Sequence, residues 1–213
     1  KIAQVTAYYP PHLGGMEQRI KDLSEKLSKK HEVEVFTSDM GCENEKLIRS
    51  TKNLKINYLK SLEFAHTPII PSLFYKLMRI PKDSIIHLHA VQATTSEIVF
   101  LVSKLRKIPY IAHIRGDAEP SGNLGFLLPI YKNKIYARVL RSAERVISLN
   151  QDYAKLAIKK YGVNRKKIRI IPNATNFKIV NNPINRLDYQ NIKLFFVGRF
   201  TCEKNIDSII EAL

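Results

Sequence analysis

Two adjacent glycines, Gly14 and Gly15, separate an apolar run at residues 1–6 from a segment with helical periodicity. Glycine lets the backbone come close to a ligand, and the free N–H groups of a helix start favour an anion. The sequence matches neither the G-x-G-x-x-G dinucleotide pattern nor a phosphate loop that ends in G-K-[ST]. The pair therefore predicts either a tight turn or a phosphate site, and the residues alone leave both open.

A pair of histidines ends a later apolar run. His87 and His89 alternate along the predicted strand, so both imidazoles lie on one face of it. A metal site would need further His, Cys or carboxylate ligands, and no nearby set completes one. We therefore expect no bound metal, and polar packing at the end of this strand.

Three polar residues, His113, Arg115 and Asp117, follow the next apolar run and flank Gly116. An imidazole, a guanidinium and a carboxylate beside a glycine turn could position an acceptor hydroxyl and a diphosphate. The alternative is a local ion pair between Arg115 and Asp117, which would contribute little at a surface.

Two cations, Arg199 and Lys204, lie between a predicted strand at residues 192–197 and a helix that starts at residue 205. Arginine binds two oxygens in a fork, and lysine acts as a compact charge. At a strand-to-helix junction they predict a diphosphate site. Two ordinary solvated side chains are the alternative.

Apolar runs alternate with amphipathic segments along the chain and must position these residues. This order predicts an α/β fold, a Rossmann-like and mainly parallel sheet with helices on both faces. Asn150 is the expected N-cap of one helix and Gly162 its stop. The predicted strands are residues 1–6, 31–37, 54–59, 84–89, 109–114, 142–149, 167–171 and 192–197, and the predicted helices are residues 16–30, 91–107, 131–141, 151–161 and 205–213.

An asparagine-rich stretch without periodicity, residues 173–191, predicts a linker between domains. Residues 1–172 then form one complete domain. Residues 192–213 supply one strand and a helix start, which cannot form a core alone. We interpret them as the opening of a truncated second domain.

The chain carries 35 Lys and Arg against 19 Asp and Glu, a net charge of +16 over 213 residues. This excess favours nucleic acid, acidic lipid or phosphorylated small molecules, or it is only a solvated basic surface. The apolar content of 45% excludes a disordered polar tract. No apolar run approaches the roughly 20 residues that span a bilayer. Two cysteines form no disulfide framework, so we expect the cytoplasm. The basic excess also fits a peripheral position on the inner membrane face.

Four motifs in a fixed order identify a family. They are Gly-Gly-Met-Glu at 14–17, Ile-Ile-His-Leu-His at 85–89, Ile-Pro-Asn at 171–173 and Val-Gly-Arg-Phe-x-x-x-Lys-Asn at 197–205. Together they resemble glycosyltransferase family four, the retaining enzymes of the GT-B fold, over nearly the whole chain. The resemblance implies two Rossmann-like domains that face a cleft, an acceptor-side N-terminal domain and a donor-binding C-terminal one. It also implies a UDP- or GDP-hexose donor, a glycan or lipid-linked acceptor, and no metal or other cofactor.

The resemblance assigns roles to the residues above. Gly14 and Gly15 would line the cleft floor near the donor diphosphate. Arg199 and Lys204 would bind that diphosphate and stabilise its charge as the sugar C1–O bond breaks. The other cleft residues that it implies are Glu17, His89 and Asn173.

The sequence departs from the family where catalysis is expected. The family usually has a histidine before the glycine of the strand end, and here Arg115 stands there, with His113 two residues earlier. Arg115 stays protonated and cannot be a general base, so His113 is its candidate replacement. The glutamates that hold the donor would lie beyond Leu213. We therefore expect the chain to be inactive alone.

The sequence suggests two functions other than a transferase. A nucleic-acid-binding protein would explain the charge, but the sequence has no zinc spacing, RNP-like motif or basic region with heptads. A GT-B-like sugar-nucleotide epimerase stays open. The segment 72–80 interleaves apolar residues with Lys76 and Arg79, either as a helix on an anionic membrane surface or, as we expect, as a core-facing helix.

Overall fold

The structure is a computed structural model that describes residues 1–42, 50–64, 67–90, 94–116, 128–174, 195–198 and 205–212. The chain divides into two compact units, Lys1–Ala174 and Thr175–Leu213. The first holds the sheet and the helices that cover it, and the second holds α7 (Ile206–Glu211).

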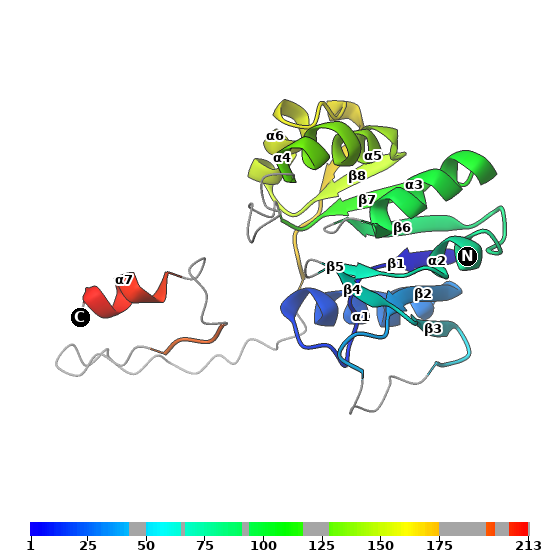
Figure 1. Ribbon diagram of the computed structural model, residues 1–213, viewed down its shortest axis with the longest axis horizontal. Coiled ribbons are helices and arrows are strands. Elements are labelled where there is room, and N and C mark those ends of the chain that lie inside the picture. Colours follow the sequence, from blue (N-terminus) through cyan, green and yellow to red (C-terminus); the bar gives the residue numbers. More distant parts are fainter. Residues whose placement is uncertain are drawn as a thin grey trace. The chain divides into compact units, whose positions relative to one another are not determined.

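Seven parallel strands form the sheet of the first unit, in the order β3-β2-β1-β6-β7-β8-β9 (Figure 1). From β1 the chain winds outward to β3, and from β6 it winds the other way to β9, so the direction reverses between β1 and β6. The predicted Rossmann-like sheet is confirmed. The strands are β1 (Ile2–Val5), β2 (Val33–Ser38), β3 (Leu54–Leu59), β6 (Ile85–Ala90), β7 (Tyr110–Ile114), β8 (Arg145–Ser148) and β9 (Ile168–Ile170).

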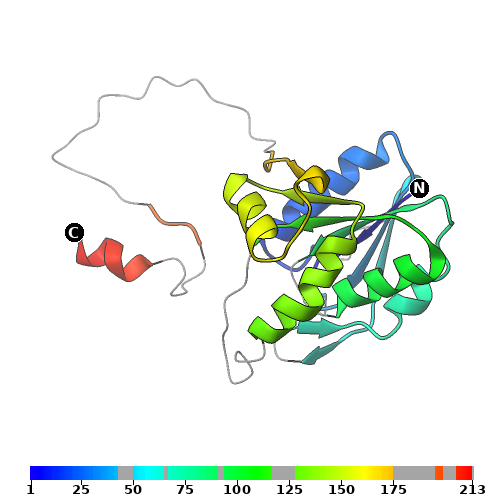
Figure 2. The ribbon, with the colours of Figure 1, turned by 90° about the horizontal axis from the view of Figure 1, so that it is seen from above.

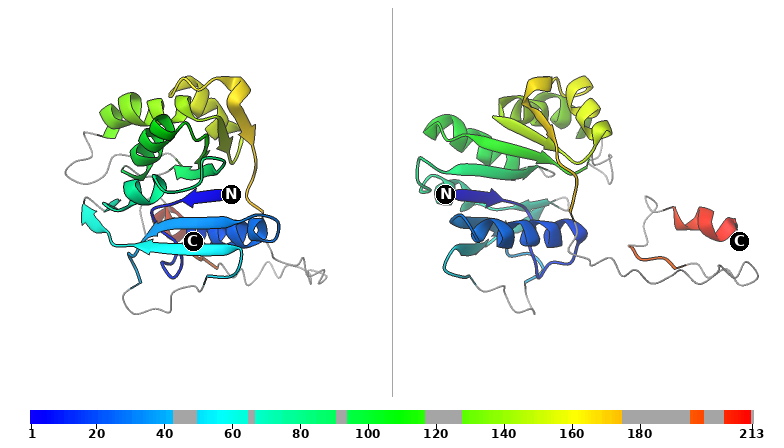
Figure 3. Two further views of the ribbon diagram at one scale, coloured as in Figure 1. Left: turned by 90° about the vertical axis from the view of Figure 1, so that its right-hand side faces the viewer. Right: turned by 180° about the vertical axis from the view of Figure 1, so that it is seen from behind.

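Helices cover both faces of this sheet. α1 (Gly15–Ser28) lies on one face, and α3 (Thr95–Arg106) and α5 (Ala137–Ser142) lie on the other (Figure 2). Right-handed crossovers that run in opposite directions from the reversal point place their helices on opposite faces. Seen from behind, α1 lies in front of the strands (Figure 3). The other α-helices described in this unit are α2 (Leu73–Leu77), α4 (Leu128–Tyr131) and α6 (Gln151–Lys159).

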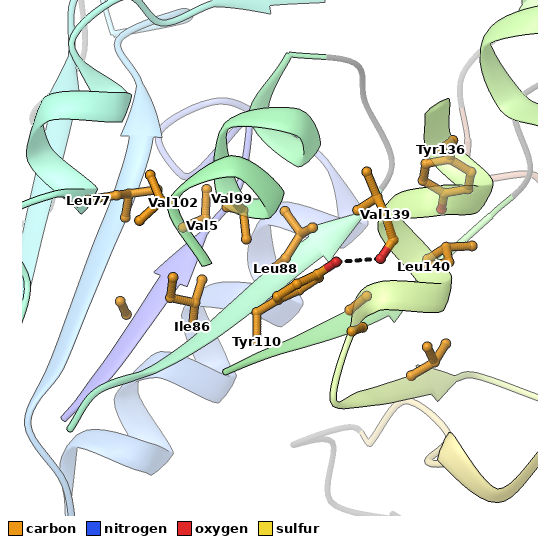
Figure 4. Packing of buried hydrophobic residues seen from close by; sticks show 14 of the residues in the cluster. Val5, Leu77, Ile86, Leu88, Val99, Val102, Tyr110, Tyr136, Val139 and Leu140 are labelled. Atoms are coloured by element: carbon orange, nitrogen blue, oxygen red, sulfur yellow. Dashed lines mark hydrogen bonds between the residues drawn. The ribbon is translucent and has the colours of Figure 1, made fainter. Parts of the chain in front are cut away.

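The larger core lies between the sheet and α3. Leu88 of β6 and Val99 of α3 are fully buried and pack in one cluster with Tyr110 (Figure 4). The Tyr110 hydroxyl donates to the backbone carbonyl of Val139 in α5, so the buried ring leaves no unpaired hydroxyl. This core holds β6 and β7, which carry the histidines, in a fixed register.

The segment at residues 72–80 faces the core, as expected. Leu73, Leu77 and Ile80 are at most 4% exposed, whereas Lys76 is exposed. In the described part of the chain, no helix is both long and apolar enough to cross a membrane.

Most predicted elements form within a few residues of their expected bounds. Asn150 caps α6, since its Oδ1 accepts from the backbone N–H of Tyr153 at 2.9 Å. Gly162 follows this helix with φ of +67°, a left-handed conformation that favours glycine. Both predictions are confirmed.

Three features differ from the prediction. A short antiparallel hairpin, β4 (Leu62–Phe64) with β5 (Thr67–Ile69), was not expected. The helix predicted at 131–141 contains a π-helical segment, Lys132–Tyr136. The strand predicted at 192–197 is not formed at residues 195–197, which have no regular structure and are exposed. A lone strand has no partner for its backbone groups, which explains this difference.

Candidate functional site

The site lies at the carboxyl edge of the sheet, where the winding reverses between β1 and β6. Open parallel sheets bind ligands in the crevice at this position. Because the strands are parallel, the ends of β1, β6 and β7 lie at the same edge. The loop after β1 leads to Gly14 and α1, and Arg115 directly follows β7. The fold thus brings together predicted residues that are about a hundred positions apart in the sequence.

At the start of α1, the carboxylate of Glu17 folds back over Gly14. A Cβ at residue 14 would lie 2.0 Å from Glu17 Oε2, so a larger residue would displace that carboxylate. Glu17 is 5% exposed, and its Oε1 lies 3.2 Å from His12 Nδ1. A Cβ at Gly15, in contrast, would meet no described atom within 4 Å. The contact with Glu17 explains why residue 14 is a glycine, whereas no described contact requires a glycine at residue 15.

Three histidines from neighbouring strands form a buried cluster. His89 of β6 is in register with His113 of β7, and His87 is in register with Gln4 of β1. The ring centroids are 4.3 Å apart for His87 and His89, 5.6 Å for His87 and His113, and 5.8 Å for His89 and His113. Gln4 also pairs with Val35, which packs against α1, so the cluster lies on the α1 face. The prediction that His87 and His89 share a face is confirmed.

Burial keeps these imidazoles neutral. Burial, and after it the positive charge of Arg115, lower the pKa of His87 to about 4 and the pKa of His113 to about 2. For His89, burial and the neighbouring His87 hold the pKa well below its usual range. Nε2 of His87 and both ring nitrogens of His113 have no hydrogen-bond partner among the described residues.

Arg115 connects this cluster to the segment after β9. Its Nε donates to His89 Nδ1, and its Nη1 donates to Asn173 Oδ1, each at 3.3 Å. The other ring nitrogen of His89, Nε2, lies 3.0 Å from Gln4 Oε1. The chain of contacts from Gln4 to Asn173 therefore links β1, β6, β7 and the end of β9. Burial, followed by the charge of Arg19, lowers the pKa of Arg115 to about 10, which leaves it cationic at neutral pH.

The three histidines are the only described group of side chains with the spacing of a metal site. One nitrogen from each lies within 4.8 Å of the others. However, both nitrogens of His89 are already engaged, and the planes of His87 and His113 are 5° from parallel, so they do not converge on one point. The guanidinium of Arg115 would also repel a cation. The arrangement favours packed neutral rings, and the absence of a metal stays a prediction.

The structure gathers most of the predicted site residues at the carboxyl edge. Gly14, Gly15 and Glu17 lie at the start of α1, and His89, His113, Arg115 and Asn173 lie at the ends of β6, β7 and β9. Asp117, Arg199 and Lys204 lie outside the described residues.

Sequence reasoning missed Gln4 and Arg19. Gln4 is a fully buried amide within an apolar strand, and that break in the apolar run is a signal that could have identified it. Arg19 is one of many cations on an amphipathic helix, and its sequence environment carries no comparable signal.

The sequence profile of Glycosyltransferase Family 4 matches residues 13–178. This chain belongs to glycosyltransferase family 4. The matched span runs from the loop before Gly14 to beyond Asn173 and so includes the described edge residues, apart from Gln4 and His12. The family predicted from the four motifs is confirmed.

Relatives of this family-4 chain are longer than it is. An uncharacterised glycosyltransferase of Methanocaldococcus jannaschii is 23% identical over 235 residues, which cover 100% of this chain and 58% of that protein. A phosphatidylinositol N-acetylglucosaminyltransferase subunit from Arabidopsis thaliana is 22% identical over 224 residues, which cover 100% of this chain and 48% of that protein. The chain thus spans about half the length of the curated relatives that it matches.

Solved structures share the fold. Sucrose-phosphate synthase from Thermosynechococcus elongatus superposes with a TM-score of 0.59 at 16% identity, covering 82% of this chain and 48% of that one. HepE of Anabaena, in complex with UDP and glucose, superposes with a TM-score of 0.54 at 14% identity, covering 82% of this chain and 44% of that one. These likenesses agree with the Rossmann-like sheet of the first unit.

Proposed function

We propose that this chain is the acceptor-side half of a retaining glycosyltransferase that uses a nucleotide-sugar donor. The observation that carries the proposal is the convergence of Gly15, Arg115 and Asn173 at the carboxyl edge, where the sheet reverses. The open space beside Gly15 leaves the first turn of α1 accessible to a ligand. The HepE structures with UDP and with UDP-glucose support a nucleotide sugar as donor.

The proposed reaction breaks the bond between the sugar C1 and the diphosphate oxygen, and an acceptor hydroxyl attacks from the face that the diphosphate leaves. Arg199 and Lys204 bind the departing diphosphate and stabilise the charge that develops on it. No metal is needed in this proposal, because the two cations provide that charge. The donor is a UDP- or GDP-hexose, whose sugar and base would contact mainly a second domain.

The acceptor hydroxyl loses a proton during transfer, and the residues at and just after the end of β7 are the proposed catalytic group. His113 is neutral at pH 7, but with a pKa of about 2 it is a weak base in the unliganded chain. Asp117, two residues beyond Arg115, is therefore the stronger candidate for the proton. Arg115 contributes a fixed positive charge and not proton transfer.

A glycan or a lipid-linked molecule is the proposed acceptor. The Arabidopsis relative is named for a phosphatidylinositol acceptor, and the net charge of +16 would favour an anionic membrane surface. Co-sedimentation with neutral and with anionic vesicles tests binding to a membrane surface. Equal binding to both kinds of vesicle would exclude an electrostatic contribution.

The direct test is nucleoside diphosphate release from UDP- and GDP-hexoses. We expect none from the 213-residue chain alone, and turnover from the protein that its complete reading frame encodes. Turnover by this chain alone would contradict its assignment as half of the catalytic unit. Conversion of the sugar nucleotide to an isomer without an acceptor would instead indicate the epimerase. Tight DNA binding in a filter assay, falling steeply with salt, would favour the nucleic-acid function.

A further inference from the structure

We propose that Arg115 and Arg19 form a binding site for an anionic group, a phosphate or a carboxylate, at the carboxyl edge of the sheet. The identity of the molecule that carries this group rests on the proposed function, as either the acceptor or the donor. The binding itself does not, since it can be measured without any sugar transfer.

The two guanidinium groups are brought together by the segment that follows β9. Arg19, in the second turn of α1, donates from Nη1 to the backbone carbonyl of Ala174 at 2.5 Å. Arg115 donates to the side chain of Asn173, the preceding residue. In Figure 1 this segment leaves β9 and runs past the strand ends towards α1. Arg19 and Arg115, which are far apart in the sequence, are thus bound to two consecutive residues of this segment.

Among the described residues, one carboxylate, that of Asp22, lies within 4.0 Å of either guanidinium. Arg115 has no described carboxylate within 4.0 Å, and Arg19 has only Asp22, at 3.9 Å. Two like charges at a partly buried edge repel each other. Burial, and after it the charge of Arg19, lower the pKa of Arg115. An anion between them would offset both the repulsion and the desolvation of Arg115.

A buried hydrogen-bond chain fixes the orientation of Arg115. A guanidinium has only donors, so His89 Nδ1 must be the unprotonated nitrogen that accepts from Arg115 Nε. The proton of the neutral ring is then on Nε2, which donates to Gln4 Oε1. Gln4 is 0% and His89 3% exposed, so water does not compete for these bonds. Gln4 and His89 are therefore positioning residues for Arg115.

This arrangement leaves part of the guanidinium available. Nε and Nη1 of Arg115 are bound to His89 and Asn173, and Nη2 has no partner among the described residues. A fixed guanidinium with a free amino group suits one oxygen of a phosphate or carboxylate, and Arg19 supplies the second contact. Pre-ordering of Arg115 lowers the entropy cost of binding.

The test is a titration of the 213-residue chain with inorganic phosphate, followed by NMR of the arginine Nε–H signals and by calorimetry. We expect saturable shifts of the Arg115 and Arg19 signals. Arg115→Gln and Arg19→Gln should each weaken phosphate binding about tenfold or more, the loss of one charge-assisted hydrogen bond. Arg138→Gln, at an exposed position of α5, is the matched control and should bind as the original chain does.

Two further variants test the mechanism. Gln4→Leu removes the acceptor of the Nε2 proton, so we expect His89 to lose its single tautomer in nitrogen NMR and phosphate binding to weaken severalfold, while the amide spectrum stays folded. Asp117→Asn should change phosphate binding by less than about twofold. Tenfold tighter binding in that variant would show that Asp117 already neutralises Arg115, and would overturn the proposal.

Separate titrations with UDP and with glucose 6-phosphate identify the source of the anion. Tighter binding of the sugar phosphate points to an anionic acceptor, and tighter binding of UDP points to the donor diphosphate. The proposal is overturned if phosphate shifts neither arginine signal, or if Arg138→Gln weakens binding as much as Arg115→Gln. If phosphate binds as expected while the complete protein transfers no sugar, the proposed function fails and the anion site remains.

Discussion

Acidification should destabilise the first unit through its three buried histidines. The folded state lowers the pKa values of His87, His89 and His113, whereas an unfolded histidine titrates near about 6.5. Below that pH the unfolded state binds more protons than the folded state, so stability is complete above it and falls with decreasing pH. For His87 the decline continues to a pH of about 4, its folded value.

The size of the effect follows from these shifts. Each pH unit below the unfolded pKa costs about 1.4 kcal/mol per histidine, so at pH 5.0 the rings of His87 and His113 each cost about 2 kcal/mol, or about 4 kcal/mol together, and His89 adds to this loss in the same direction. This is of the same order as the whole unfolding free energy of a typical domain, about 5–15 kcal/mol. Urea unfolding followed by circular dichroism at pH 7.0 and pH 5.0 measures the difference.

A variant isolates the contribution of one ring. His113→Phe keeps an aromatic ring of similar size but removes its titration, so the loss between pH 7.0 and pH 5.0 should shrink by about 2 kcal/mol. His31→Gln changes an exposed histidine and should leave the loss unaltered. An original chain that loses less than about 2 kcal/mol over this range, or a His31→Gln variant that matches His113→Phe, would refute the reasoning.

Four further substitutions test local features of the fold. Gly15→Ala should stabilise the chain by up to about 1 kcal/mol in urea unfolding, since alanine is the better helix former and the space is open, yet lower turnover of the complete enzyme if a ligand approaches there. Gly14→Ala, the matched change, should instead lower stability because its Cβ meets the Glu17 carboxylate, and equal effects at both glycines would contradict this distinction. Asn150→Ala should cost about 1 kcal/mol in the same assay through loss of the α6 cap, and no change would argue against that cap. Tyr110→Phe should cost about 1–3 kcal/mol because a buried carbonyl of α5 loses its donor, whereas a neutral effect would indicate that water replaces it.

The parallel sheet could be predicted because its signals are local. Buried strands such as β6 are short apolar runs, and α1 shows apolar residues at helical spacing. The hairpin of β4 and β5 gave no such signal, because Leu62 and Phe64 are 68% and 61% exposed and the strands are three residues long. The π-helical segment at residues 132–136 adds one residue to a turn, which periodicity over so few residues does not resolve.

The residues of the site were largely predictable, but their connections were not. Position at strand ends identified His89 and Arg115, and the motif order identified Asn173. Their hydrogen bonds depend on the register between β1, β6 and β7, which no single segment encodes. The link from Arg19 to Ala174 spans 155 positions and exists only because the segment after β9 returns to α1.

The most direct measurement is sugar transfer by the complete protein, compared with variants that lack either of the two side chains proposed to bind the diphosphate. We expect a radiolabelled hexose to move from UDP or GDP to an acceptor with its anomeric configuration retained. Arg199→Gln and Lys204→Gln should each lower turnover at least about a hundredfold, as expected for charges that stabilise the leaving group. An inverted product, or turnover that is unchanged in both variants, would contradict the proposed mechanism.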